Sequence, residues 1–395
     1  MSTATIREKP KRRAGVFFTG MALYCMFFGA GNLIFPLLIG KTSGTQTSAA
    51  ILGLTISAVI FPLLGLIAMM FFGGNLHRFL ERLGKGPAFG LLLLLQITQG
   101  PLCMSRLFTL MHASIKGYFA WATLPIASIL IAAIAFALTY RPQRLVALLG
   151  IVLTPAFLLA LGILVVVGVY TAPPMPVSLE GAGFHFLQGI RGGYMTMDLI
   201  SALLFATMVV PHFGEGTEGL SKEEAEQHIR RKMTGASLVA AGLLTISYVG
   251  LCWLSAHHTW TLPGTVSPED LLHAISVKIL GYWGGVIGAA TVFLACLTTA
   301  ISLAAVFSKY LRNDVLQNRV SPTAALILTL AITAATTNLG FSGILRVLGP
   351  ILEILYPGLI VLCLLNIAHS LYEVKPVKIP VFGALALALF GFCFG

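Results

Sequence analysis

Long apolar runs recur along the whole chain and leave little choice of fold. A helix that crosses a lipid bilayer takes roughly 20 mainly apolar residues. Runs of this kind, separated by short polar joints, occupy eleven segments: 14–40, 48–74, 86–114, 119–140, 144–170, 184–212, 233–256, 275–307, 322–340, 343–370 and, shorter, 379–395. Of the 395 residues, 57% are hydrophobic and only 10% are charged, unlike a soluble domain. We therefore predict an all-α polytopic membrane protein with about 11 transmembrane helices.

The Lys and Arg residues are distributed unequally between the two sides of the membrane that this topology predicts. A formal net charge of +11 could indicate a nucleic-acid-binding surface. If the loops alternate from a cytoplasmic N-terminus, however, 19 of the 25 Lys and Arg residues fall on that side, beginning with the basic segment 1–13. This is the positive-inside pattern, and no segment interleaves the charge with aromatic residues. We expect the lipid bilayer of the cytoplasmic (inner) membrane as the environment, and no nucleic acid partner.

The number of helices in each half predicts the domain organisation. Residues 171–183, rich in Pro and Gly, form an outer linker between a first set of five helices, 14–170, and a second set, 184–370. Residues 371–395 then add one C-terminal helix. Because five is odd, the second set begins on the opposite side of the membrane. Two sets with one fold would be a 5+5 inverted repeat, an architecture in which the first helix of each repeat is broken near the midplane.

Both of these first helices are interrupted in the sequence. Residues 29–36 read GAGNLIFP, and residues 190–200 read IRGGYMTMDLI with Gly192 and Gly193 ahead of an aspartate. For the first helix we predict a half-helix over 14–28, a break at 29–32 and a second half over 33–40. An interruption at membrane depth is tolerated where the freed backbone groups line a cavity or are buried in protein. The glycines could alternatively be packing contacts between helices.

Half-helix ends that meet at one point suit a zwitterion. The N-terminal end offers N–H groups to a carboxylate, and the C-terminal end offers carbonyls to an ammonium group or a cation. Asp198 could bind the ammonium group, a cation or a proton, or could cap the second half-helix. The predicted substrate-binding residues are Phe28, Gly29, Ala30, Gly31, Asn32, Thr196, Met197 and Asp198.

A run of hydroxyl side chains in the eighth apolar segment indicates a cation site. The sequence LACLTTAISL, residues 294–303, places Ala295, Thr298, Thr299 and Ser302 on one helix face. Hydroxyls and carbonyls are oxygen donors for a small monovalent cation. The predicted ligands are Thr298 and Thr299 with the carbonyls of Ala295, Cys25 and Phe28. The alternative is that the hydroxyls merely bond the carbonyls one turn back in their own helix.

Three further charges lie within apolar runs, where insertion is costly. Arg106 follows Gly100 and Pro101, which predict a kink, and no partner for it is apparent. Arg346 and Glu353 lie seven residues apart on one face of the tenth helix, and we expect them to form a structural or gating network rather than a binding site.

With these segments in view, the chain resembles the branched-chain amino acid:cation symporter family, whose members resemble the leucine-transporter fold. The matching stretches occur in family order: FFGAGNLIFPLLIG (27–40), GYMTMD (193–198), LACLTTAISL (294–303) and TNLGFSGILRVLGPILEILYP (337–357). The chain departs from the family pattern at Leu37 and Ser105, where prolines are usual. It also has about eleven helices where the family usually has twelve.

The resemblance implies a secondary active transporter that takes up leucine, isoleucine and valine with Na+ by alternating access. It implies that the first break handles the amino and carboxyl groups and that Thr298 and Thr299 coordinate sodium. The alternative is symport of another neutral amino acid, with proton coupling through Asp198 as one version. We expect no enzyme, because H-E-x-x-H, G-x-S-x-G and phosphate-loop motifs are missing. Without a C-x-x-C pair, we also expect no cofactor and no metal other than Na+.

Overall fold

The computed structural model describes residues 15–140, 154–214, 221–262, 264–374 and 377–394. The apolar runs within these residues are helical, and these residues contain no strand. The first half comprises α1 (Val16–Phe27), α2 (Ala30–Ser43), η1 (Gly44–Gln46), α3 (Thr47–Thr55), the π-helical turn η2 (Ile56–Ile60), α4 (Phe61–Phe71), α5 (Leu76–Glu81), α6 (Lys85–Ile97), the π-helical η3 (Thr98–Cys103), α7 (Met104–Ile115), α8 (Leu124–Thr139) and α10 (Thr154–Tyr170). The second half comprises α11 (Ala182–Thr196), α12 (Asp198–Gly214), α13 (Lys222–His258), η6 (Thr259–Thr261), η7 (Pro268–Asp270), α14 (Leu271–Tyr310), the π-helical η8 (Leu311–Val315), α15 (Pro322–Thr337), α16 (Gly340–Tyr372) and α17 (Lys378–Phe394).

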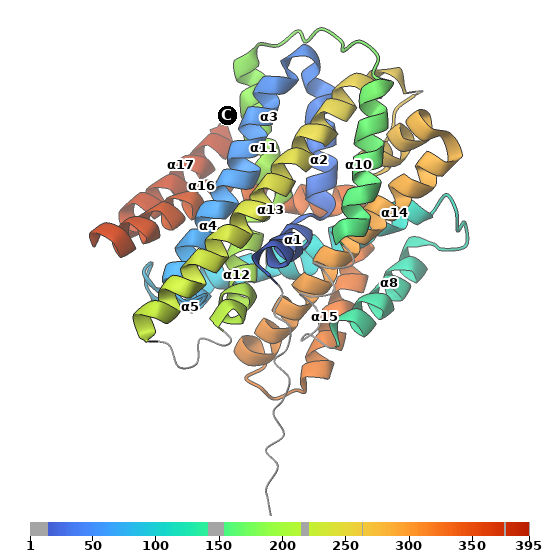
Figure 1. The fold of residues 1–395 in the computed structure, drawn as a ribbon. Coiled ribbons are helices and arrows are strands. Elements are labelled where there is room, and N and C mark those ends of the chain that lie inside the picture. The colour runs from blue at the N-terminus through green and yellow to red at the C-terminus, as the bar shows by residue number, and fades with distance from the viewer. Residues whose placement is uncertain (1–14, 141–153, 215–220, 263, 375–376, 395) are drawn as a thin grey trace, which may run out of the picture.

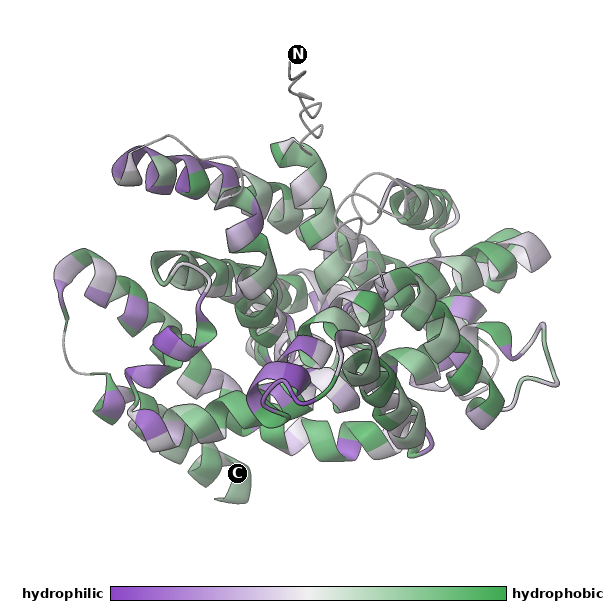
Figure 2. Cartoon of the chain, turned by 90° about the horizontal axis from the view of Figure 1, so that it is seen from below, coloured by the Kyte–Doolittle hydropathy of each residue, from purple (hydrophilic) through white to green (hydrophobic). Residues whose placement is uncertain are grey.

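Each of the eleven predicted apolar runs contains at least one of these helices. Six helical stretches among the described residues are long and apolar enough to cross a membrane, and five shorter apolar helices accompany them. The multi-pass membrane fold is thus confirmed, although residues 144–153 of the fifth run and the basic segment 1–13 lie outside the described residues. Figure 2 shows largely green helices, with purple residues gathered at helix ends and turns.

The two halves are packed together reciprocally. The first helix of the first half, α1 with α2, packs on α13, the second helix of the other half. Conversely, α11 and α12 pack on α3 and α4. The fourth helices, α8 and α15, pack on each other, and Figure 1 shows α1 in the middle of the assembly. This exchange is what a 5+5 inverted repeat with a broken first helix in each repeat produces.

One end of the molecule carries most of the described basic residues. The lower end in Figure 1 holds α5, the first turns of α13 and the turn between α14 and α15. We call this end the basic face; its Lys and Arg residues include Arg78, Arg82, Arg230, Arg231, Lys232, Lys309, Arg312 and Arg319.

The first break is shorter than predicted. Only Phe28 and Gly29 lie between α1 and α2, so the predicted break at 29–32 is wrong for its last three residues, which form the first turn of α2. The reason is local: the side-chain oxygen of Asn32 accepts a hydrogen bond from the Gly29 N–H at 3.2 Å. One of the N–H groups without a partner at the helix start is thereby satisfied, and the helix begins three residues earlier than predicted.

The second break is the single residue Met197, in the left-handed conformation (φ 68°, ψ 17°) between α11 and α12. The glycines to which we attributed the interruption, Gly192 and Gly193, lie inside α11 instead. A Cβ atom on Gly193 would lie 1.8 Å from Ser57 Oγ, and one on Gly192 would lie 2.4 Å from Ile39 Cδ1. The pair therefore allows α11 to approach η2 and α2 closely, which is the packing alternative.

Gly193→Ala is expected to destabilise the protein, because its methyl group would overlap Ser57 and overpacking costs about 1–3 kcal/mol. Thermal unfolding of the purified protein in detergent measures the loss. Gly162→Ala is the matched control, since nothing lies within 4 Å of a Cβ atom at this position in α10. Adding Ser57→Gly should recover part of the loss; equal stability of Gly193→Ala and Gly162→Ala would contradict the close approach.

Candidate functional site

The two breaks are joined by a buried cluster of polar side chains. Asn32 Nδ2, on the first turn of α2, donates to both carboxylate oxygens of Asp198 at 2.8 Å. Tyr248 on α13 donates to Asp198 Oδ2 at 2.6 Å and also hydrogen-bonds Asn32 Nδ2. Asp198 is fully buried, so these donors take the place of water around its carboxylate. The start of α12 is therefore tied directly to the start of α2.

The backbone at the second break is held from the third helix of the first half. Arg106 Nη1 on α7 donates to the carbonyl of Met195 at 2.9 Å. Gln99 Nε2 donates to the carbonyl of Met197 at 2.9 Å and to Ser201 Oγ at 3.0 Å. Gln99 lies in η3, the π-helical segment that contains Pro101. Where the sequence predicted a kink, the helix is therefore locally wider than an α-helix. Short π-helical segments of this kind are often found at functional sites.

The charges at this break match the ends of the half-helices. A cation is favourable at a helix C-terminus and an anion at a helix N-terminus. Arg106 contacts the last turn of α11, and Asp198 is the first residue of α12. Arg106 and Asp198 interact electrostatically, without forming a direct ion pair within the described residues. The two buried charges thus balance each other across the break.

Arg106 also reaches the first break. A Cβ atom on Gly31 would lie 2.8 Å from Arg106 Nη2 and 2.8 Å from the Cα atom of Thr196. The guanidinium therefore packs against the first turn of α2, where helix geometry leaves N–H groups without partners. Arg106 Nε has no hydrogen-bond partner in the described part of the chain, although the side chain is only 1% exposed. The Arg106 guanidinium and the first turn of α2 together offer several hydrogen-bond donors to an anion.

Four oxygens of the predicted cation site converge beside the first break. Thr298 Oγ1 lies 3.1 Å from the carbonyl oxygen of Cys25 and 2.8 Å from that of Ala295. Thr299 Oγ1 lies 3.2 Å and 3.3 Å from the same two oxygens. Both hydroxyls hydrogen-bond the Ala295 carbonyl of their own helix, as the alternative interpretation expected, but both also hydrogen-bond the Cys25 carbonyl of α1. Cys25 belongs to the last turn of α1, whose carbonyls lack intrahelical partners.

Phe28, the fifth predicted ligand, lies in the break next to these oxygens. A Cβ atom on its neighbour Gly29 would lie 3.1 Å from Thr299 Oγ1, so the break directly contacts the threonine pair. The Phe28 ring packs on Tyr24 of α1, with a centroid distance of 5.1 Å, and on rings of two other helices, 4.9 Å from Phe157 of α10 and 6.1 Å from Tyr248 of α13. The ring helps to enclose the break on the α10 and α13 side.

Comparison with known proteins places these features in a family. A family model described as "Branched-chain amino acid transport protein" matches residues 12–393. The chain belongs to this family. Branched-chain amino acid permease BrnQ of Corynebacterium glutamicum is 29% identical over 375 residues, which cover 91% of this chain and 82% of the permease. Family members are named as permeases and carriers, so the chain is a transporter and not an enzyme.

Solved transporters share the fold of this family member. Mhp1, a nucleobase-cation-symport-1 family transporter in a closed conformation, aligns with a TM-score of 0.64 at 13% identity, covering 97% of this chain and 93% of Mhp1. MhsT in complex with L-phenylalanine aligns with a TM-score of 0.56 at 15% identity, covering 97% of this chain and all of MhsT (100%). At these identities the likeness concerns the fold alone, and it agrees with the leucine-transporter-like architecture expected from the sequence.

The remaining predicted site residues of this branched-chain transport family member lie in the same region. Ala30 and Gly31 are in the first turn of α2, and Thr196 and Met197 are at the second break. Thr196 Oγ1 donates to the carbonyl of Gly193 at 2.8 Å. All the residues predicted for substrate and for cation are buried. The structure therefore brings both groups together around the α1–α2 break.

Two members of the polar cluster were missed from the sequence. Gln99 could have been noticed as an amide side chain within an apolar run beside Gly100 and Pro101, whereas Tyr248 gave no signal, because tyrosine in a membrane helix is unremarkable on its own. The expected network of Arg346 and Glu353 is wrong: Arg346 is exposed, Glu353 is half-buried, and neither forms an ion pair within the described ranges.

Proposed function

We propose that this transporter carries leucine, isoleucine and valine into the cytoplasm together with Na+, by alternating access around the two breaks. The observation that carries the proposal is the convergence of the Thr298 and Thr299 hydroxyls with the carbonyls of Cys25 and Ala295. Carbonyls at the ends of half-helices are the groups that coordinate Na+ in transporters of this architecture. The convergence provides a set of uncharged oxygen donors without a carboxylate.

The amino acid would bind at the same breaks. Its carboxylate would meet the first-turn amides of α2, next to the Arg106 guanidinium, and its ammonium group would face the carbonyl ends of α1 and α11. Phe28 and Met197 in the breaks, Phe205 on α12 and Met104 on α7 are fully buried apolar side chains, which would surround an aliphatic side chain. The family description and the name of the C. glutamicum permease both specify branched-chain amino acids, which supports this substrate class.

The orientation follows from charge. Basic loops are retained on the cytoplasmic side of a membrane, and anionic lipid attracts them there. We therefore place the basic face, with α5 and the start of α13, in the cytoplasm of a cell whose inner membrane holds the protein. Uptake then runs from the α10–α11 end of the molecule towards the basic face.

A second candidate is symport of a neutral amino acid coupled to a proton on Asp198. The specific observation is that the donors recorded around this buried carboxylate in the described part of the chain, Asn32, Tyr248 and Thr196, are all neutral, so a proton on it would remove a buried charge. MhsT, which has this fold, was solved in complex with L-phenylalanine, a neutral amino acid that is not branched-chain. A substrate outside the leucine, isoleucine and valine group is therefore compatible with the architecture.

Asp198→Asn is expected to separate the two candidates. Under sodium coupling, the variant should take up labelled leucine into proteoliposomes about tenfold more slowly, because Arg106 loses its balancing charge. The residual uptake should still require a sodium gradient and should be indifferent to a proton gradient. Uptake by the unaltered protein that follows the proton gradient without sodium, and that disappears in Asp198→Asn, would refute sodium coupling.

A further inference from the structure

An apolar groove of about 760 Å³ lies between the end of α7 and the first half of α14. Its lining begins at Ile115, includes the turn that follows α7, and continues along α14 from Tyr282 to Leu294. None of the described residues that line it is charged, and its polar side-chain groups are the hydroxyls of Tyr118 and Tyr282 and the N–H of Trp283. The volume lies within the range of ligand pockets, roughly 300–1,000 Å³. A ligand that fits this groove is therefore apolar along most of its length.

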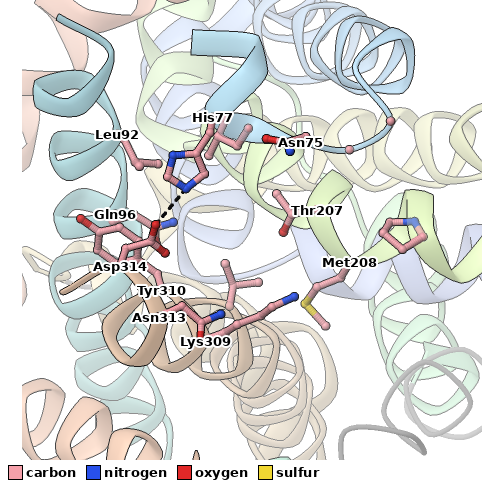
Figure 3. A pocket seen from close by; sticks show the side chains of 15 residues that line it. Asn75, His77, Leu92, Gln96, Thr207, Met208, Lys309, Tyr310, Asn313 and Asp314 are labelled. Carbon is pink, nitrogen blue, oxygen red and sulfur yellow. Dashed lines mark ion pairs between the residues drawn. The ribbon is translucent and has the colours of Figure 1, made fainter. Parts of the chain in front are cut away.

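A cavity on the basic face has the opposite character. Its walls include His77, Lys309 and Asp314, and an ion pair joins His77 Nε2 to Asp314 Oδ1 at 2.9 Å (Figure 3). Walls of this kind suit water at the membrane surface, because a charge that faces hydrocarbon is costly. The uncharged walls of the groove between α7 and α14 suit the hydrocarbon of the bilayer instead.

The groove extends over the depth of one leaflet. The stretch formed by α6, η3 and α7, Lys85–Ile115, starts beside α5 on the basic face, so its last residue lies on the opposite side of the membrane. α14 ends on the basic face (Figure 1), and its direction changes at Gly281 (φ 63°, ψ −149°), directly before Tyr282. From Tyr282 to Leu294 the helix rises about 18 Å, and one leaflet contributes about 15 Å of hydrocarbon. The groove therefore runs from the surface opposite the basic face to about the midplane.

Aromatic side chains surround the surface end of the groove. Tyr282 and Trp283 are 68% and 73% exposed, and Trp121, in the turn after α7, is 61% exposed. The Tyr118 ring lies 6.3 Å from the Tyr282 ring. Tyr and Trp are enriched at the level where headgroups meet hydrocarbon, whereas the deep end of the groove is formed by apolar side chains such as Phe293. This gradient matches a lipid whose headgroup lies at the surface and whose acyl chain points inward.

The groove lies on the two helices that carry the central site. Leu294 directly precedes Ala295, whose carbonyl is one of the four oxygens of the predicted cation site. Ile115, on the other wall, belongs to the same helix as Arg106. Helices in a membrane associate chiefly through van der Waals packing, and α7 and α14 pack on each other directly. A chain in the groove therefore adds contacts to both helices where they face the lipid.

We propose that the groove between α7 and α14 binds one acyl chain of a phospholipid from the leaflet opposite the basic face. The chain lies along Val286, Ala290 and Phe293, and its ester end lies beside the hydroxyls of Tyr118 and Tyr282. The bound chain stabilises the packing of α7 on α14. This inference depends on the multi-pass membrane fold and is independent of which amino acid or ion the transporter carries.

Ala290→Phe tests the site, because Ala290 is an exposed lining residue seven positions after Trp283 and the added ring occupies the groove. Trp121, Trp253 and Trp260 are first replaced by Phe, which leaves Trp283 as the only tryptophan. The protein is reconstituted in phosphatidylcholine with brominated acyl chains, which quench tryptophan on contact, and is then diluted into detergent with unbrominated lipid. A chain held in the groove should make the recovery of Trp283 fluorescence severalfold slower than in Ala290→Phe.

The matched control is Ala331→Phe, at an exposed position of α15 outside the groove. It should keep the slow recovery of the unaltered groove. Recovery that is already fast with the unaltered groove would show that Trp283 meets only freely exchanging lipid. Recovery that stays slow in Ala290→Phe would show that the retained lipid lies elsewhere. Either result would overturn the proposal.

Thermal unfolding gives a second readout that needs neither transport nor fluorescence. Delipidated protein in detergent should unfold at a higher temperature when phosphatidylcholine is added. Lysophosphatidylcholine should give most of this increase, because it supplies the one chain that the groove holds, and glycerophosphocholine, which has no chain, should give none. Ala290→Phe should lose most of the increase and Ala331→Phe should retain it; an equal increase in both variants would refute the site and leave the proposed symport untouched.

Discussion

Replacing Thr298 and Thr299 together by alanine is expected to raise the sodium concentration that half-saturates leucine uptake by about 100-fold. The two hydroxyl oxygens are half of the four oxygens that converge beside the first break. A hydrogen-bonding contact to a charged group contributes about 1.5–3 kcal/mol, and each 1.4 kcal/mol is a factor of ten in affinity. Initial uptake of labelled leucine into proteoliposomes, over a wide range of external sodium with choline as replacement, measures the change.

The matched control for this double variant is Thr291→Ala in the same helix. Thr291 is fully buried, and its hydroxyl donates to the Ile287 carbonyl of its own helix at 2.7 Å. It therefore tests the loss of a buried hydroxyl in α14 without a contact to α1, and it should leave the half-saturating sodium concentration within about twofold. If the double variant retains the sodium dependence of the unaltered protein, the threonines are only structural and the sodium site lies elsewhere.

Arg106→Met is expected to abolish leucine uptake and to lower the stability of the protein. Arg106 is the cation on the last turn of α11 and balances the buried Asp198. Methionine keeps much of the length of the side chain but leaves the Met195 carbonyl without its donor and Asp198 without its counter-charge. Leaving buried polar groups without their partners costs about 1–3 kcal/mol or more, measured as a lower midpoint of thermal unfolding in detergent.

The contribution of charge balance is isolated by a second substitution. In Arg106→Met/Asp198→Asn both charges are gone, so the stability should recover most of what Arg106→Met loses, while uptake stays absent because the donors near α2 remain missing. Arg191→Met, at an exposed position of α11, is the control for loss of an arginine. Losses that simply add in the double variant would show that the two sites are independent and that Arg106 does not balance Asp198.

The polar cluster also explains how two breaks so far apart in sequence form one site. Asn32 satisfies the Gly29 N–H with its oxygen and contacts Asp198 with its nitrogen. A single amide therefore caps the second half of the first helix and binds the start of the second half of the sixth. We expect α2 and α12 to change position together during the transport cycle, because the Asn32–Asp198 hydrogen bonds join the two half-helices directly.

The helical membrane fold, the positions of the two interrupted helices and the grouping of Thr298 and Thr299 with the Cys25 and Ala295 carbonyls were all predictable from the amino-acid sequence. Insertion of a helix depends on the transfer free energy of its own roughly 20 residues, so each run can be judged alone. The threonine pair was found because Thr298 and Thr299 follow Ala295 by three and four residues and therefore lie on the same helix face as Ala295.

The exact limits of the breaks and the contacts of the buried charges depend instead on tertiary packing. Gly192 and Gly193 are indistinguishable in sequence from a helix break, and only the approach of Ser57 and Ile39 shows that they are packing residues. Tyr248 and the carbonyl partner of Arg106 likewise depend on how whole helices are rotated against one another. That rotation is fixed by side-chain packing between segments distant in sequence, which no single apolar run contains.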